Sequence, residues 1–380
     1  MNFSERIDNV QESQTLKFTN IIGSIRKKGQ SVIDFAVGEP LFDTPEEVID
    51  ATKQALDDRK TRYSSVSGLV ELKESIANNL KNLSYDKDNI TITNGSKQAL
   101  YSIFQALCNP GDEVIVPSPF WVSFPEQIKL AGAKPVSVDT VEHQLDLDKI
   151  KKAISKKTKA IVVNSPNNPT GAVYPKNKLK ELVDIASEKN IFIISDEAYD
   201  WLVYDGIKPQ TLASLFSGEA KNIITVKSFS KTFAMTGFRI GYVAAEKEVI
   251  SKLNKLQSHL AGNVCTFAQY GALAATKIDE KVIERNVKEL EKKRNLAYGL
   301  VSKQFDCVKP QGAFYLFPNI EKKFNGKIKN SVDLAEFILK KAGVAVVPGS
   351  AFGSDSKIRI SYAVSNEELK EGFEKIAEAL

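Results

Sequence analysis

A lysine flanked by hydroxyl groups and followed by an arginine is the part of this chain best suited to chemistry. Lys231 ends Ser-Phe-Ser-Lys (228–231), and Arg239 follows in Thr-Gly-Phe-Arg-Ile-Gly (236–241), where 238–243 is expected to be a strand. Arginine offers a planar charged fork to phosphate oxygens, and serines add donors. A nearby positive charge and partial burial lower the pKa of a lysine towards its nucleophilic form. The segment indicates an amine that forms a Schiff base beside a phosphate; a solvated lysine is the alternative.

Two apolar strands are expected to end in polar residues. The run 191–194 leads to Asp196, and Tyr199 follows one short turn later. Fully buried parallel strands have this composition, and open α/β sheets bind ligands at the carboxyl ends of such strands. Asp196 there suits a protonated ring nitrogen, or it caps the next helix. The strand 159–163 leads into the rigid turn Asn-Asn-Pro-Thr-Gly (167–171), which contains Asn168 and is otherwise a common strand-to-helix connection.

A third strand, 91–93, precedes Asn-Gly-Ser-Lys (94–97) and a helix with one apolar face. Small residues at a helix start leave its free N–H groups open to an anion, so Gly95 and Ser96 indicate a phosphate site, although many helices begin this way. Trp121 lies in a proline-stiffened loop after the strand 113–116. It either stacks on a flat ligand ring or packs in the core.

Together these motifs resemble the fold type I pyridoxal-phosphate-dependent aminotransferases of class I/II, in order and in spacing, from about residue 13 to the C-terminus. The resemblance implies an α/β fold with a mainly parallel central sheet sandwiched by helices, plus a smaller α/β domain. The large cofactor-binding domain would span 44–286, and the small domain 1–43 and 287–380 with an N-terminal closing segment. Strand-like and helical stretches alternate from about 45 to 285, and a charged helix is expected at about 281–303.

The resemblance also implies a role for each motif residue. Lys231 would hold pyridoxal phosphate as a Schiff base and then move the proton at the substrate α-carbon. Asp196 would pair with the ring nitrogen, Tyr199 and Asn168 would hydrogen-bond the 3′ oxygen, and Trp121 would stack on the ring. The expected phosphate ligands are Gly95, Ser96, Ser228, Ser230, Arg239 and, from a second subunit, Tyr63. A homodimer with shared active sites follows; without the resemblance, Tyr63 is a surface-loop residue.

For the substrate, the resemblance assigns Arg359 to the α-carboxylate and Gly38 to a close backbone approach. Arg359 alternates with isoleucines in the strand-like stretch 358–362, so it is not merely an edge charge. Lys97 matches the aspartate aminotransferases that bind the distal carboxylate with a lysine. Ser13 and Thr15 match the segment that closes over acidic substrates in that subgroup, and Trp121 and Asn168 also face the substrate there.

The expected reaction is ping-pong transamination between an L-amino acid, most simply aspartate, and 2-oxoglutarate. Aromatic, prephenate-type or broad specificity stays open, as does a carbon–sulfur (β-elimination) lyase, because lyases of this fold share nearly every cofactor residue. A ligand-sensing regulator needs a DNA-binding module, and residues 1–44 are too few and too unlike a helix-turn-helix to supply one.

Composition narrows the function class further. The 380 residues carry 52 basic and 47 acidic side chains, with no basic block interleaved with aromatics, so no nucleic-acid partner is expected. Three scattered cysteines and two histidines outside the motifs favour a reducing compartment and disfavour a metal site or a Ser-His-Asp triad. The start lacks a signal-peptide core, and no run is long enough to span a membrane, so a cytoplasmic protein is expected.

Overall fold

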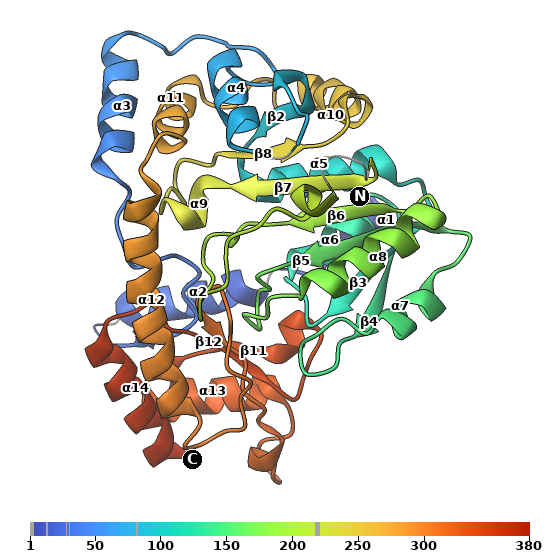
Figure 1. The fold of residues 1–380 in the computed structure, drawn as a ribbon. Coiled ribbons are helices and arrows are strands. Elements are labelled where there is room, and N and C mark those ends of the chain that lie inside the picture. The colour runs from blue at the N-terminus through green and yellow to red at the C-terminus, as the bar shows by residue number, and fades with distance from the viewer. Residues whose placement is uncertain (1–3, 13, 28, 30, 81–82, 217–220) are drawn as a thin grey trace.

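A seven-stranded mixed sheet forms the centre of the molecule in the computed structural model, which describes residues 4–12, 14–27, 29, 31–80, 83–216 and 221–380 (Figure 1). The strand order is β2-β8-β7-β6-β5-β3-β4, and all pairs are parallel except those that β8 makes with β2 and β7. Its strands are β2 (Ile90–Thr93), β3 (Glu113–Ser118), β4 (Lys134–Asp139), β5 (Thr158–Asn164), β6 (Phe192–Asp196), β7 (Ile223–Ser228) and β8 (Gly241–Ala244). The predicted fold class is confirmed.

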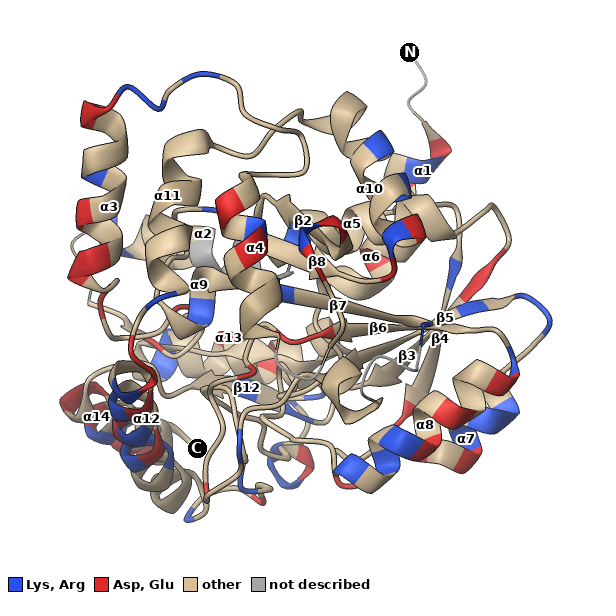
Figure 2. Ribbon diagram, turned by 45° about the horizontal axis from the view of Figure 1, so that its top comes forward, with Lys and Arg blue, Asp and Glu red and all other residues tan. Residues whose placement is uncertain are grey.

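Helices cover both faces of this sheet, which is why its central strands are apolar along their whole length. In β5, Val162 packs in one core with helices on one face, and Ile161 and Val163 pack in a second core on the other. The first face is covered by α5 (Gly95–Leu107), α6 (Ser123–Leu130) and α10 (Lys247–Leu260). The second is covered by α7 (Leu147–Ala153) and α8 (Lys176–Glu188), whose outer sides carry mixed charges (Figure 2).

A third group of helices packs at the β2 and β8 end of the sheet. Apolar residues from α3 (Glu46–Asp57), α4 (Val70–Asn79) and α11 (Thr266–Ala275) share one core with β2 and β8. The short α9 (Phe229–Thr232), directly after β7, contributes Phe229 to the same core. The end of β7 is therefore anchored by packing, and Lys231 lies on the helix that begins there.

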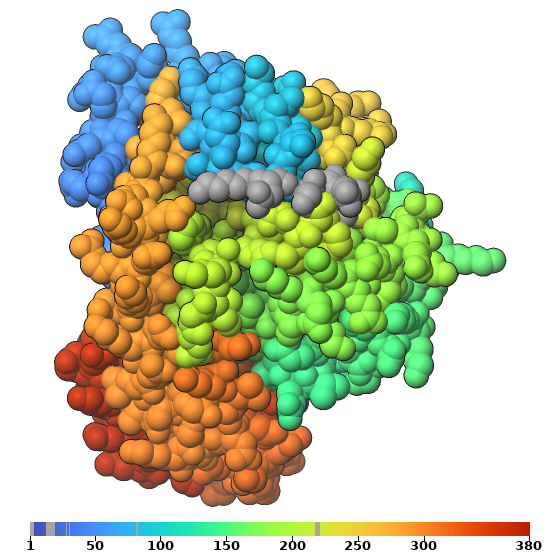
Figure 3. Space-filling view, in the orientation of Figure 1, coloured from blue at the N-terminus to red at the C-terminus, as the bar shows by residue number. Residues whose placement is uncertain are grey.

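A second unit joins the two ends of the chain. Its strands are β1 (Ile33–Asp34), parallel to β10 (Val344–Ala345), and an antiparallel sheet of β11 (Val347–Pro348), β12 (Ile358–Ser361) and β9 (Tyr315–Leu316). Its helices are α12 (Glu280–Val301), which runs between the two units, α13 (Ser331–Ala342) and α14 (Asn366–Ala379) (Figures 1 and 3). The helices α1 (Glu5–Asp8) and α2 (Gln14–Lys27) precede β1. The predicted helix at 281–303 corresponds to α12.

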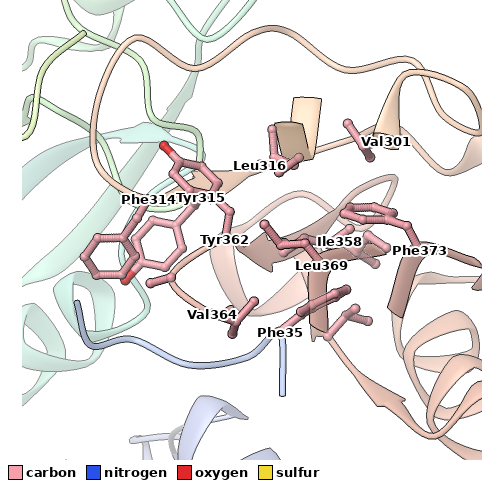
Figure 4. Packing of buried hydrophobic residues seen from close by; sticks show 14 of the residues in the cluster. Phe35, Val301, Phe314, Tyr315, Leu316, Ile358, Tyr362, Val364, Leu369 and Phe373 are labelled. Carbon is pink, nitrogen blue, oxygen red and sulfur yellow. The ribbon is translucent and has the colours of Figure 1, made fainter. Parts of the chain in front are cut away.

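The core of this second unit extends towards the end of β6. Tyr199, Leu202 and Tyr204 follow β6 in the sequence, yet they pack in one core with residues of α12, α13 and α14. Figure 4 shows Phe314, Tyr315 and other residues of the same core. The residues directly after β6 therefore contact both units. The boundaries 44–286 and 1–43 with 287–380 stay a prediction. None of the helices within the described ranges is both long and apolar enough to cross a membrane.

Candidate active site

Lys231 occupies the first turns after β7, at the carboxyl end of a central strand. Ser228 caps this short helix by accepting a hydrogen bond from the Ser230 N–H at 3.0 Å. The half-buried Lys231 donates from Nζ to the Gly38 carbonyl at 2.6 Å, which links the second unit to the sheet. Burial lowers the pKa of Lys231 to about 8; the Glu39 carboxylate opposes this shift, and the Arg359 guanidinium adds to it. The amine is thus tuned towards the nucleophilic form.

Asp196 ends the neighbouring strand β6 and is buried. One carboxylate oxygen accepts from the Ala198 N–H at 3.2 Å. Burial raises the pKa of Asp196 to about 7, against the Ala198 hydrogen bond and with the help of the Glu197 charge. No salt bridge to this carboxylate is found within the described ranges, so Asp196 is suited to a cationic ligand atom.

Glu197, the next residue, points to a separate buried ion cluster. Its carboxylate lies 3.5 Å from Lys227 Nζ, which also pairs with Asp200 at 2.6 Å. Burial acts to lower the pKa of Lys227, but the Asp200, Tyr242 and Glu197 groups outweigh it and raise that pKa. In the motif Asp-Glu-Ala-Tyr (196–199), the Lys227 ammonium therefore neutralises Glu197. Asp196 has no such cationic partner within the described residues.

Four buried side chains form a closed set of contacts beside Asp196. Tyr199 Oη lies 3.0 Å from Tyr315 Oη, and Asn168 Nδ2 donates to Tyr199 Oη at 3.5 Å. Arg359 Nη1 donates to Asn168 Oδ1 at 3.1 Å, and the guanidinium carbon lies 4.4 Å from the Tyr315 ring centroid. All four residues are at most 5% exposed. The set joins β12 and β9 of the second unit to the ends of β5 and β6.

Arg359 is held by backbone and aromatic contacts. Its Nη2 donates to the Ala36 carbonyl at 3.0 Å, and the guanidinium carbon lies 5.1 Å from the Phe352 ring centroid. The buried Nε has no hydrogen-bond partner within the described part of the chain. A buried permanent cation needs an anionic partner, and its planar fork suits a carboxylate.

A glycine-lined cradle lies at the start of α5. A Cβ on Gly95, whose φ is +74°, would lie 2.5 Å from Arg239 Nη2, and one on Gly241 would lie 2.8 Å from the Ser96 nitrogen. Arg239 is exposed, has a φ of +57°, and donates to the Thr236 carbonyl at 2.9 Å. The expected strand 238–243 was therefore wrong at its start, since β8 begins at Gly241. The free N–H groups of α5 and this guanidinium form a donor set that fits a phosphate.

Lys97 and Trp121 lie together near this cradle. Lys97 Nζ is 5.2 Å from the Trp121 ring centroid, and Trp121 packs edge-to-face against Phe124 at 5.4 Å. Trp121 therefore serves the core on one side and borders the site on the other. The Lys97 residue is exposed, yet desolvation, with a contribution from the Arg239 charge, lowers the pKa of its amine.

Of the sequence-predicted residues whose side chains the structure describes, Tyr63 is not brought to this site within one chain. Tyr63 lies between α3 and α4 and is 98% exposed. Ser13 lies outside the described residues. Thr15 lies in α2, but its side chain is likewise outside the described part. Within the described ranges, no cluster of three or more histidine, cysteine, aspartate or glutamate side chains is arranged for a metal ion.

Sequence reasoning missed Tyr315 and Phe352, which pack on Arg359. Tyr315 belongs to Gly-Ala-Phe-Tyr-Leu-Phe (312–317), an aromatic run after α12 that reads simply as core. Phe352 carries no local signal, because it reaches the site only through the fold of the second unit. The shared register of β12 with β9, which pairs Ser361 with Tyr315, is the feature that brings Tyr315 near Arg359.

Comparisons with known proteins agree on one family. The profile for aminotransferase class I and II matches residues 30–376. A probable aspartate/prephenate aminotransferase of Aquifex aeolicus is 44% identical, over 99% of this chain and 98% of that protein. An aspartate aminotransferase of Bacillus subtilis is 39% identical, over 99% and 98%. The solved structure of Thermus thermophilus aspartate aminotransferase with maleate has a TM-score of 0.95 and 37% identity, with both chains covered completely.

Proposed function

Because this chain belongs to the class I and II aminotransferases, we propose that it uses pyridoxal phosphate to transfer the amino group of aspartate to 2-oxoglutarate in a ping-pong cycle. The observation that carries this proposal is the convergence of three groups on one site: a lysine with a lowered pKa, a buried carboxylate with a raised pKa, and a buried arginine with an unpartnered Nε. These are Lys231, Asp196 and Arg359. The relatives named for aspartate support the choice of substrate.

The donor and acceptor set fits pyridoxal phosphate. When bound, the cofactor supplies the electron sink that makes a substrate α-proton acidic. Asp196 would bind its ring nitrogen, because a buried carboxylate is relieved by a cationic partner. Tyr199 and Asn168 would hydrogen-bond the 3′ oxygen, and Trp121 would border the ring. The phosphate would be held by Gly95, Ser96, Ser228, Ser230 and Arg239, with Tyr63 of the partner subunit.

Lys231 would both attach the cofactor and move the substrate proton at Nζ. A pKa near 8 leaves a useful fraction of the amine neutral at physiological pH, and a neutral amine is the nucleophile and the base. The Gly38 carbonyl accepts a hydrogen bond from Nζ at 2.6 Å, a contact that orients the amine.

Arg359 would bind the α-carboxylate that every amino acid carries. Lys97 would bind the distal carboxylate of acidic substrates, with Ser13 and Thr15 in the segment that closes over them. Trp121 and Asn168 would contact the substrate as well as the cofactor. The lowered pKa of Lys97 and its contact with Trp121 support an amine held at the edge of the site rather than free in solvent.

The assembly we propose is a cytoplasmic homodimer with shared active sites. Tyr63 is 98% exposed in the single chain, so its hydroxyl is accessible to a second subunit. The large domain would comprise 44–286 and the small domain 1–43 and 287–380. The parallel pairing of β1 with β10 supports a small domain built from both ends of the chain.

A substrate comparison tests the assignment. In Lys97→Ala, kcat/KM for aspartate and glutamate should fall by about 30-fold or more, because truncating one partner of a covered charge pair costs about 2–5 kcal/mol. An exposed pair contributes only about 0.2–1 kcal/mol, so a smaller loss would show that the bound site stays open. Alanine and phenylalanine lack the distal carboxylate, and their rates should not fall.

Two further variants make this comparison decisive. Arg359→Ala should slow all amino acids alike, and Lys180→Ala, which removes an exposed lysine on the outer side of α8, should slow none. Equal loss with acidic and neutral substrates in Lys97→Ala would refute the aspartate assignment. Turnover without any 2-oxo acid would instead identify a lyase, since only a transaminase needs that co-substrate.

Prephenate is a second candidate amino acceptor. The specific observation is that the 44% identical Aquifex aeolicus relative is named for both aspartate and prephenate. Prephenate also carries a second carboxylate that Lys97 would bind. Measuring amino transfer from aspartate to prephenate beside 2-oxoglutarate decides whether this chain accepts both.

A further inference from the structure

The hydrogen bonds in the closed set of contacts beside Asp196 have a defined direction. This set consists of Arg359, Asn168, Tyr199 and Tyr315. A guanidinium only donates, so Asn168 must present Oδ1 to Arg359, at 3.1 Å. Its amide nitrogen then faces Tyr199 Oη, at 3.5 Å, and donates to it. The Tyr199 oxygen is thereby an acceptor, and its single O–H is left for one further partner.

Within the protein, the Tyr315 hydroxyl is a hydrogen-bond partner of the Tyr199 hydroxyl. The two hydroxyl oxygens lie 3.0 Å apart, and either can donate. In the proposed function, on which this inference rests, Tyr199 donates to the 3′ oxygen of the cofactor. Its hydrogen is then used, so Tyr315 has to donate to Tyr199 Oη if that hydrogen bond is kept.

We propose that Tyr315 is a positioning residue: its hydroxyl directs and strengthens the Tyr199 hydrogen bond to the cofactor, and its ring supports the carboxylate-binding guanidinium of Arg359. A phenol that accepts a hydrogen bond becomes a better donor, by about 10–30% per bond. The ring contribution is separate, since the Arg359 guanidinium carbon lies 4.4 Å from the ring centroid. One side chain thus serves both the cofactor half and the substrate half of the site.

The surroundings keep both phenols neutral. Burial raises the pKa of Tyr199 and that of Tyr315, and the Arg359 charge opposes both shifts without reversing them. Asp196 is the other charged group facing Tyr199. Lys231 Nζ donates to the Gly38 carbonyl, and a Cβ on Gly38 would lie 3.8 Å from Tyr315 Oη. Tyr199 and Tyr315 therefore act as proton-bearing donors throughout the working pH range.

The test is a pH titration of the absorption of the enzyme-bound cofactor. A donor at the 3′ oxygen withdraws negative charge from it and holds down the pKa of the cofactor's titrating nitrogen nearby. Tyr199→Phe should raise that pKa by about 1–2 units, the value of a hydrogen bond to a charged group. Tyr315→Phe should raise it by about 0.1–0.7 units, which is the cooperative fraction of that bond.

A double variant decides whether Tyr315 acts through Tyr199. The Tyr199→Phe/Tyr315→Phe protein should titrate like Tyr199→Phe alone. Additive shifts, or an unchanged titration in Tyr315→Phe, would overturn the proposal. Tyr362→Phe is the matched control: this equally buried hydroxyl donates to the Ala313 carbonyl at 3.0 Å, so its loss should leave the titration unchanged (Figure 4).

The role of the Tyr315 ring is tested by measuring KM for amino acid substrates. Tyr315→Phe keeps the ring and should leave KM for all amino acids within about twofold. Tyr315→Leu should raise KM by about 2–30-fold for acidic and neutral amino acids alike, because a cation–π contact is lost. Equal KM effects of the two variants would refute the division between ring and hydroxyl. A wild-type protein that binds no pyridoxal phosphate would refute the proposed function itself, a result distinct from any of these.

Discussion

Replacing Asp196 by asparagine tests the claim that the site holds an unpaired carboxylate for a cationic ligand atom. The folded-state pKa of about 7 is raised above the ordinary aspartate value of 3.8, so the native protein binds this proton more tightly than the unfolded chain. The stability contributed by the proton is full below about pH 4 and is lost as the pH rises through 7. Without cofactor, the charged form therefore destabilises the native state.

The size of the effect follows from the two pKa values. At 1.36 kcal/mol per unit, ionisation lowers the unfolding free energy by roughly 2 kcal/mol at pH 5 and by roughly 4 kcal/mol at pH 8.5. Asparagine has nearly the same shape, retains an acceptor for the Ala198 N–H and does not ionise. Any effect of the asparagine amide on the unfolding free energy that does not depend on pH cancels when the two pH values are compared. The unfolding free energy of Asp196→Asn minus that of the wild type should therefore increase by roughly 2–3 kcal/mol from pH 5 to pH 8.5.

The assay is chemical denaturation of cofactor-free protein at fixed protomer concentration, at both pH values. Asp139→Asn is the control, because Asp139 also ends a parallel strand but its side chain is exposed to solvent. Adding pyridoxal phosphate should stabilise the wild type more than Asp196→Asn at pH 8.5. The inference would be wrong if the two proteins differed in unfolding free energy by the same amount at pH 5 and at pH 8.5. The ionised Asp196 carboxylate would then not destabilise the native state.

Three further results are expected. Lys231→Ala should still bind pyridoxal phosphate through the phosphate contacts but lose transamination; a kcat within tenfold of wild type (about 1.4 kcal/mol of barrier) would exclude Lys231 as the catalytic lysine. Tyr63→Phe should weaken cofactor binding by about 1.5–3 kcal/mol. Mixing it with Lys231→Ala chains should give heterodimers in which one site carries both defects and the other is intact, whereas heterodimers with one defect in each site would place Tyr63 in its own subunit's site. Asp205→Ala should lower the unfolding free energy, measured by denaturation, by about 1–3 kcal/mol. The reason is that Asp205 binds the fully buried guanidinium of Arg294 through two hydrogen bonds of 2.8 Å. An unchanged denaturation midpoint would show that Glu291 alone balances the charge of Arg294.

Local sequence was enough to predict the fold class and several strand ends. The runs before Asp196 and before Asn168 are apolar throughout because helices cover both faces of the sheet, and this composition identifies buried parallel strands without any tertiary information. Turn and cap residues then mark where each strand stops. The strand expected at 238–243 starts late, at Gly241, because Arg239 adopts a positive φ that its apolar neighbours do not signal.

The contacts around Arg359 were decided only by the tertiary structure. Arg359, Asn168 and Tyr199 come from three distant segments, and Tyr315 joins them through the pairing of β12 with β9. The pKa of Asp196 likewise depends on how completely the fold removes water from it and on the engagement of Glu197 by Lys227. Sequence determines which groups stand at strand ends, because hydrophobic periodicity and turn chemistry are local. Distances between those groups, and the desolvation that sets their pKa values, arise only when segments far apart in the chain pack together.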